Sequence, residues 1–318
     1  MITYILFVIG FVVLIKGADL LVDGAASIAK KLKISSIVIG LTIVAFGTSA
    51  PELIVNIFAS ASGNTEIAIG NILGSNIANI LLILGISSII YPLVTKENTV
   101  WKEIPLCLLG AIILGVMAND MLIDKTLFSG LTRIDGIVLI AFFIIFLYYT
   151  FGISKISADT EETEIKEFGY LKSSVFIILG LVGLSLGGKW IVDGAVKIAE
   201  LFDISQSLIG LTVVAIGTSL PELATSAIAA YKKQTDIAIG NVVGSNIFNI
   251  FWILGLSSII RPLPFQVDSN WDIVMTILSS LLLFAIMFIG KKHTVERWQG
   301  VVMILMYVGY MVFLVSSK

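Results

Sequence analysis

The feature that most constrains this chain is a short polar block that occurs twice within strongly apolar sequence. Residues 46–53 read FGTSAPEL and residues 216–223 read IGTSLPEL, so each copy carries one glutamate, Glu52 or Glu222. Charge inside a membrane is costly and marks ion or substrate pathways. Two such charges, in duplicated segments that should break a helix, are typical of a mid-membrane transport site built from two repeats.

A second shared block follows each of these copies, and the two copies of both blocks are 170 residues apart. Residues 66–80 read EIAIGNILGSNIANI and residues 236–250 read DIAIGNVVGSNIFNI. Ser75 and Asn79 are four residues apart, so they lie on one helix face, and Ser245 and Asn249 repeat that spacing. The glycines of these blocks allow neighbouring helices to approach closely. We therefore expect the serine and asparagine side chains to join the two glutamates.

Composition places the chain in the membrane class. Hydrophobic residues make up 57% of the chain, charged residues make up 13%, and the mean hydropathy is +1.03. A soluble domain carries roughly 25% charged residues, so the sequence predicts an all-α polytopic membrane protein. The net charge of −2 gives no attraction for nucleic acid, and the single cysteine, Cys107, excludes an intramolecular disulfide or a cysteine-rich metal site. No HExxH, Ser/His/Asp or nucleotide-loop motif is present, so we expect neither an enzyme nor a cofactor.

Ten apolar segments approach the length of about 20 residues that a spanning helix needs. They lie at 2–29, 36–61, 66–91, 102–119, 133–151, 173–200, 206–230, 236–260, 271–290 and 297–316. The sequence thus predicts a first five-helix repeat at 1–151, an acidic linker at 152–172 and a second five-helix repeat at 173–318.

An odd number of helices in each repeat means that the two repeats enter the membrane in opposite directions. The repeats are therefore expected to be inverted. Lysine clusters at 30–33, 232–233 and 291–292 fall on the same side as the linker under this helix count. Because positively charged loops remain in the cytoplasm, we expect a multi-pass protein of the cell membrane with the linker in the cytoplasm and both termini outside it.

The first block supplies the chemistry of a cation site. Pro51 and Pro221 remove backbone donors, so each helix should kink nearby and expose carbonyl oxygens, which cannot face lipid. Hydroxyl groups stand within one turn of each glutamate at Thr48, Ser49, Thr218 and Ser219. All of these candidate ligands are oxygen atoms, which suit hard cations such as Ca²⁺. Two carboxylates match the charge of one divalent ion, and the same oxygens suit Na⁺.

The motifs GTSxPE and GSNIxN, each present twice, resemble the repeats of the calcium/cation antiporter superfamily, and most closely its prokaryotic sodium/calcium exchanger branch. The resemblance covers essentially the whole chain. It implies that Glu52 and Glu222 bind Ca²⁺ and share Na⁺, and that Asn79 and Asn249 complete the centre of the site. It implies further oxygen ligands from the side chains of Thr48, Ser49, Ser75, Thr218, Ser219 and Ser245 and from the carbonyls of Ala45 and Ala215.

One position departs from part of that superfamily. Some relatives, including potassium-dependent exchangers, carry Asp where this chain has Asn249, so the site here is less negative. This difference argues against K⁺ co-transport. Asp23 and Asp193, in the repeated VDGA, fall nearer helix ends, and we expect them to form structural pairs or caps.

The functional hypothesis is a secondary antiporter that exchanges Na⁺ for Ca²⁺ by alternating access. Its partners would be the two ions and the lipid bilayer, and it is expected to act as a monomer. The residues leave an H⁺/Ca²⁺ antiporter open, because protons on Glu52 and Glu222 could replace Na⁺. A cation channel is less favoured, because the sequence contains no selectivity-filter motif.

Overall fold

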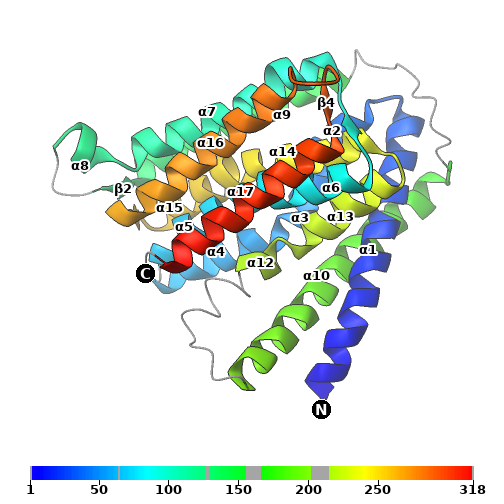
Figure 1. The fold of residues 1–318 in the computed structure, drawn as a ribbon, viewed down its shortest axis with the longest axis horizontal. Helices are drawn as coiled ribbons and strands as arrows, with labels where there is room; N and C mark the ends of the chain where they lie inside the picture. Colours follow the sequence, from blue (N-terminus) through cyan, green and yellow to red (C-terminus); the bar gives the residue numbers. More distant parts are fainter. Residues whose placement is uncertain (1, 64, 126–128, 155–165, 202–214, 317–318) are drawn as a thin grey trace.

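The computed structural model describes residues 2–63, 65–125, 129–154, 166–201 and 215–316. Within these ranges the chain is a bundle of helices, and each strand is only two residues long (Figure 1). The expected span 206–230 lies partly outside the described residues, which resume with α12 (Ala215–Thr218) and α13 (Leu220–Tyr231). Much of the expected linker, residues 155–165, also lies outside them.

Seven described helices are long and apolar enough to cross a membrane, or eight if one bent pair counts as a single span. The seven are α1 (Ile2–Leu32), Ala68–Ile90, Thr99–Met117, α9 (Arg133–Ser154), α10 (Tyr170–Leu201), Thr235–Ile260 and α17 (Arg297–Ser316). The bent pair joins Ser36–Thr48 to Ala50–Ser62 at an angle of 47°. The expected span at 271–290 is a shorter apolar helix, α16 (Asn270–Ile286). These helices are those of a multi-pass helical membrane protein, by their length and composition.

Two composite helices form the centre of the bundle. The first runs from α5 (Glu66–Ile77) through the π-helical segment η2 (Ala78–Leu84) into α6 (Gly85–Ile90). The second repeats that order as α14 (Thr235–Ile247), η5 (Phe248–Leu254) and α15 (Gly255–Ile260). In their most apolar stretches 78% and 94% of the residues are buried, whereas the share is between 22% and 39% in the other long helices. Single π-helical turns inside α-helices are frequent at functional sites.

The bent pair consists of short pieces that pack against this centre. These are α2 (Ser36–Ile39), the π-helical η1 (Gly40–Val44), α3 (Ala45–Thr48) and α4 (Ala50–Ser62). The remaining elements are the π-helical η3 (Thr99–Glu103), α7 (Ile104–Met117), α8 (Asp120–Ile123) and the 3₁₀ turn η6 (Val267–Ser269). The segments η1 and α3 lie against α14, so the first half of the chain contacts the core of the second.

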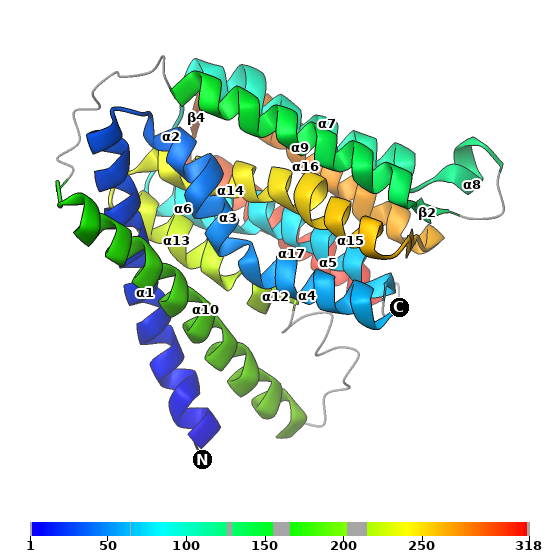
Figure 2. The same ribbon diagram turned by 180° about the vertical axis from the view of Figure 1, so that it is seen from behind.

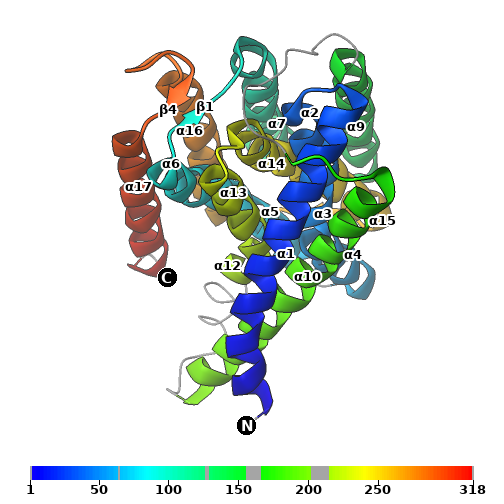
Figure 3. The ribbon, with the colours of Figure 1, turned by 90° about the vertical axis from the view of Figure 1, so that its right-hand side faces the viewer.

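The two halves are interlocked by exchanged contacts. Strand β1 (Leu93–Val94) pairs antiparallel with β4 (Thr294–Val295), and β2 (Gly130–Leu131) pairs antiparallel with β3 (Leu263–Pro264). Each sheet therefore takes one strand from each half, and Figure 3 shows β1 beside β4 at one end of the bundle. Helices are exchanged in the same way, since α17 packs on α6 and α9 packs on α15.

Helices α1 and α10 cross as an antiparallel pair that projects from the bundle (Figures 1 and 2). Their seam is lined by glycines spaced seven residues apart, with Gly10 against Gly187 and Gly17 against Gly180. A Cβ atom at Gly17 would lie 2.7 Å from the Leu184 nitrogen. The two backbones are therefore in direct contact, and a larger residue at this position has no room.

Ion pairs fasten one end of α1 to its neighbours. The Lys232 ammonium, just after α13, lies 2.6 Å from a carboxylate oxygen of Asp19 and 2.6 Å from one of Asp23. Lys30, near the end of α1, lies 2.8 Å from Glu167, and this cation holds the pKa of the Glu167 carboxyl below its usual range. Asp23 thus forms the structural pair that its sequence position suggested.

We expect Gly17→Ala to destabilise the protein by about 1–3 kcal/mol, because the added methyl group must push apart two backbones. Gly309→Ala in α17 is the matched control, since no atom lies within 4 Å of its added Cβ, and alanine favours a helix over glycine by about 1 kcal/mol. Thermal unfolding in detergent, followed by circular dichroism, should show a lower midpoint for Gly17→Ala alone. Equal midpoints for the two variants would contradict the close contact.

Candidate cation site

Two helix breaks, at Ser49 and Ser219, determine the positions of Glu52 and Glu222. Ser49 has φ −80° and ψ 6°, which ends α3, and α4 begins at Ala50 with proline next. Ser219, with φ −85° and ψ 3°, makes the same break ahead of α13. Glu52 and Glu222 consequently lie in the first turn of a helix, where the free N–H groups and the helix dipole favour negative charge. A break next to the proline is present in both copies, and the bend of 47° in the first copy confirms the predicted kink there.

The breaks bring the two carboxylates into one buried cluster. Glu52 and Glu222 are both fully buried. The Ser49 hydroxyl donates to Glu222 Oε1 at 3.0 Å, and the Ser75 hydroxyl donates to Glu52 Oε1 at 3.4 Å. Because Ser49 and Glu222 come from different halves, the cluster lies across the interface between them.

The other expected side chains belong to the same network. The hydroxyls of Ser75 and Ser219 share a hydrogen bond of 3.2 Å, and the Asn249 amide donates to Ser75 at 3.3 Å. The Thr218 hydroxyl lies beside Glu52. The hydroxyls of Thr48 and Ser245 lie beside Glu222. Asn79 joins the network through Asn246, which accepts a hydrogen bond from its amide at 2.9 Å.

The two expected carbonyls stand at the start of the broken segments. Ala45 O accepts hydrogen bonds from the Ser49 nitrogen at 3.0 Å and from the Thr48 hydroxyl at 3.3 Å, so it lies next to the cluster. Ala215 is the first residue of α12, four positions ahead of Ser219. The side chains expected from the sequence therefore lie in one buried cluster. Their role as ion ligands is a proposal.

Several buried oxygen atoms of this cluster have no hydrogen-bond partner among the described residues. They are Glu52 Oε2, Glu222 Oε2, Asn79 Oδ1, Asn249 Oδ1 and Ser245 Oγ. No lysine, arginine or histidine of the described ranges forms an ion pair with either glutamate. A buried carboxylate without a counter-charge is strongly unfavourable. The cluster is thus a set of buried oxygen atoms whose negative charge has to be balanced by a cation or by protons.

The composition of the donor set selects the kind of cation. In the part of the chain that the structure describes, no group of three or more His, Cys, Asp or Glu side chains is placed to hold a metal. Hydroxyl, amide and carbonyl oxygens would have to supplement the two carboxylates. Such a set suits Ca²⁺ or Na⁺ rather than a transition metal, which prefers imidazole or thiolate.

Three asparagines of the cluster were missed from the sequence. Asn241 accepts a hydrogen bond from the Thr48 hydroxyl at 2.9 Å and donates to Ser226 at 2.9 Å and to the Glu222 carbonyl at 3.3 Å. Asn76 and Asn246 lie between Asn79 and Asn249. The signal was available, because Asn76 and Asn246 repeat at the offset of 170 residues and Asn241 repeats Asn71 in the same way.

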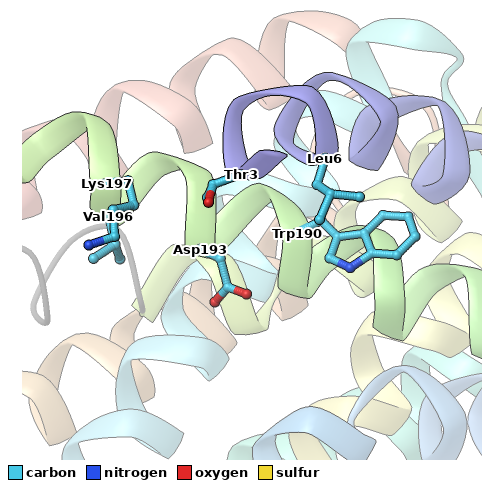
Figure 4. A pocket seen from close by; sticks show the side chains of 6 residues that line it. All are labelled: Thr3, Leu6, Trp190, Asp193, Val196 and Lys197. Carbon is cyan, nitrogen blue, oxygen red and sulfur yellow. The ribbon is translucent and has the colours of Figure 1, made fainter. Parts of the chain in front are cut away.

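A separate cavity of about 370 Å³ lies between the start of α1 and the end of α10. Figure 4 shows its lining, with Asp193 and Lys197 on one helix and Thr3 and Leu6 on the other. None of the clustered residues around Glu52 and Glu222 lines it. Asp193 therefore lies outside the candidate cation site, and it was not among the site residues expected from the sequence.

Comparison with known proteins agrees with this geometry. Residues 2–152 and 172–316, which carry both copies of each polar block, match the family described as sodium/calcium exchanger protein. The chain belongs to this family. The resemblance drawn from the motifs is thereby confirmed, and the family is one of transporters rather than enzymes.

Relatives of similar length support the assignment. Sodium/calcium exchanger MaX1 of Methanosarcina acetivorans is 33% identical, with 98% of each chain covered. A membrane protein of Methanocaldococcus jannaschii is 39% identical, with 95% of this chain and 94% of that protein covered. The solved structure of the sodium-calcium exchanger NCX_Mj, soaked with Na⁺ and Ca²⁺, has a TM-score of 0.84 at 36% identity, with 98% of each chain covered.

Loss of the Ser49 hydroxyl should weaken cation binding. Ser49→Ala removes a donor that holds Glu222 Oε1, and a hydrogen bond to a charged group contributes about 1.5–3 kcal/mol. We expect the Kd for Ca²⁺ to rise about tenfold or more in calorimetric titrations of the purified protein. Ser185→Ala is the control, because among the described residues that exposed hydroxyl bonds only the Leu181 carbonyl of its own helix. A native Kd for Ser49→Ala would show that this contact does not shape the site.

Proposed function

We propose that this protein is an antiporter that exports Ca²⁺ in exchange for Na⁺ by alternating access, without a need for K⁺. The observation that carries the proposal is the convergence of Glu52 and Glu222 from the two halves of the chain. Both are fully buried, each keeps one oxygen without a hydrogen-bond partner, and no basic side chain in the described ranges pairs with them. Membership of the sodium/calcium exchanger family supports the same ions.

Charge balance explains how two ions could be exchanged at one site. One Ca²⁺ neutralises two carboxylates, and Na⁺ ions can occupy overlapping oxygen ligands. The two cations would then compete for Glu52 and Glu222, so that loading by one displaces the other. A site without either cation keeps two negative charges in a low-dielectric interior, which makes its passage across the membrane unfavourable. That penalty couples export of one ion to entry of the other.

The proposed architecture is ten spanning helices in two inverted repeats, 1–151 and 173–318, joined by the linker 152–172. Helices α1 and α10 occupy equivalent positions at the 170-residue offset and run antiparallel, as an inverted repeat requires. Strands and helices exchanged between the halves support the same relation. The linker would lie in the cytoplasm and both termini outside it, in a protein that acts as a monomer in the bilayer.

The two long helices are the elements we assign to alternating access. They project from the bundle that holds the site, and they contact the bent pair and α13 that carry Glu52 and Glu222. A shift of this pair against the bundle would open the site to one side and close it to the other.

Transport in proteoliposomes tests the function. We expect ⁴⁵Ca²⁺ uptake to follow an imposed Na⁺ gradient at fixed pH, and to be abolished in Glu52→Gln and Glu222→Gln, because each variant removes half of the site's charge. Glu103→Gln is the matched control, since Glu103 is buried outside the site and its amide can still accept the Tyr149 hydroxyl bond of 2.7 Å. Uptake driven by a pH gradient without Na⁺ would indicate H⁺/Ca²⁺ exchange, and Ca²⁺ conductance without a counter-ion would indicate a channel.

Asn249 tests the independence from K⁺. An amide offers a neutral oxygen, so the native site carries two formal charges, whereas Asn249→Asp adds a third that calls for a further cation or a proton. We expect native Na⁺-driven Ca²⁺ flux to be the same with and without K⁺, and Asn249→Asp to be more sensitive to mild acid. Flux of both proteins would be recorded across pH with K⁺ present or omitted. A strict K⁺ requirement in the native protein, or identical pH profiles, would refute this role.

A further inference from the structure

Asn76 and Asn246, which no transport role has so far explained, form a reciprocal contact at the centre of the molecule. Both side chains are fully buried. The Asn76 amide donates to the main-chain carbonyl of Asn246 at 3.3 Å, and the Asn246 amide donates to the main-chain carbonyl of Asn76 at 3.2 Å. Each asparagine therefore anchors its NH₂ group on the backbone of the opposite half.

This anchor fixes the orientation of a second pair of amides. A main-chain carbonyl only accepts hydrogen bonds, so the NH₂ group of Asn76 must face Asn246 O and its Oδ1 must face the other way. That oxygen accepts from the Asn249 amide at 2.9 Å. On the opposite side, Asn246 Oδ1 accepts from the Asn79 amide at 2.9 Å. The NH₂ groups of Asn79 and Asn249 are thus turned toward the anchor.

The outcome is a defined direction for the two remaining oxygens. Asn79 Oδ1 and Asn249 Oδ1 are buried and have no hydrogen-bond partner among the described residues. The Asn249 NH₂ group also donates to Ser75, whose hydroxyl contacts Glu52. We propose, building on the proposed function, that Asn76 and Asn246 are positioning residues that hold the amide oxygens of Asn249 and Asn79 toward the transported cation.

The electrostatic consequence of this orientation is large for a site built from neutral amides. An asparagine side chain presents either an oxygen or an NH₂ group after a half-turn, and the two differ little in shape. The oxygen attracts a cation, whereas the NH₂ group repels it. Because η2 and η5 begin two residues after Asn76 and Asn246, the anchor also lies where both central helices change from α to π geometry.

Asparagine is suited to the anchor because one side chain must donate a hydrogen bond to the opposing main-chain carbonyl and accept one from the amide of Asn249 or Asn79. An aspartate would set a carboxylate oxygen against the opposing main-chain carbonyl, and serine is too short to reach both partners. A purely packing role would need only the volume of the side chain. The two roles therefore make different predictions for variants that remove the amide.

Double-mutant cycles on the full chain separate the two roles. The variants are Asn76→Ala, Asn249→Ala and both together, with the equivalent cycle for Asn246 and Asn79. The pairs Asn76/Asn79 and Asn246/Asn249 serve as controls, because no direct side-chain hydrogen bond joins them. Calorimetry gives the Kd for Ca²⁺ in Na⁺-free buffer, and thermal unfolding gives stability. Both glutamates remain in every variant, so binding stays measurable.

We expect Asn76→Ala alone to raise the Kd by about tenfold, the upper end of what a lost hydrogen bond costs, but by less than about twofold when Asn249 is already alanine. Asn246→Ala should raise the Kd by the same factors, alone and when Asn79 is already alanine. In the control pairs the two single increases in Kd should multiply. The positioning role would be overturned if the factors by which the single substitutions raise the Kd also multiplied in the pairs Asn76/Asn249 and Asn246/Asn79. It would equally be overturned by a lower unfolding midpoint with an unchanged Kd. If Asn76→Ala does not fold, Asn76→Ser replaces it, because its hydroxyl is too short for the Asn249 amide.

The same measurements distinguish this inference from the function on which it rests. A native protein that binds neither Ca²⁺ nor Na⁺ in calorimetry would refute the proposed exchanger and the positioning role with it. A native protein that binds Ca²⁺ and exchanges it for Na⁺, but shows no coupling in either bonded pair, would refute the positioning role alone.

Discussion

The burial of two like charges governs this structure. Glu52 and Glu222 are fully enclosed, and no basic side chain of the described ranges pairs with either one. Such an arrangement is stable only if hydrogen bonds, together with a cation or protons, compensate the lost hydration. The helix breaks at Ser49 and Ser219 turn free N–H groups toward the carboxylates. The hydroxyls around them then supply the nearest donors.

The exchange of elements between halves serves the same need. A site shared by two repeats keeps its geometry only if the repeats cannot separate. The strands β1 and β4, the strands β2 and β3, and the helix pairs α6–α17 and α9–α15 each join one half to the other. The central asparagines add hydrogen bonds between α5 and α14. We infer that the halves unfold together rather than as independent domains.

Much of the fold and of the site was predictable because the chain is duplicated. A constant offset identified Glu52 with Glu222 and Ser75 with Ser245, and apolar length predicted most spans. The π-helical segments were not predictable, because ANILLIL and FNIFWIL read as ordinary apolar helix. Asn76 was missed because an asparagine in an apolar helix is as compatible with a hydrogen bond between helices as with a place in a site, and the sequence does not distinguish the two. The two-residue strands are too short to leave a pattern.

The ion pairs that Lys232 forms with Asp19 and Asp23 of α1 make the two halves of the molecule unequal. Lys232 holds Asp19 and Asp23, whereas the equivalent position in the first half is Ser62, which has no charge to offer α10. A duplicated transporter would rest with equal ease in its two mirrored states if its halves were identical. The ion pairs of Lys232 have no counterpart at position 62, so they are one contact by which two such states would differ in energy. A resting preference that depends on such ionic contacts would respond to ionic strength, while the side chains clustered around Glu52 and Glu222 keep their repeated pattern.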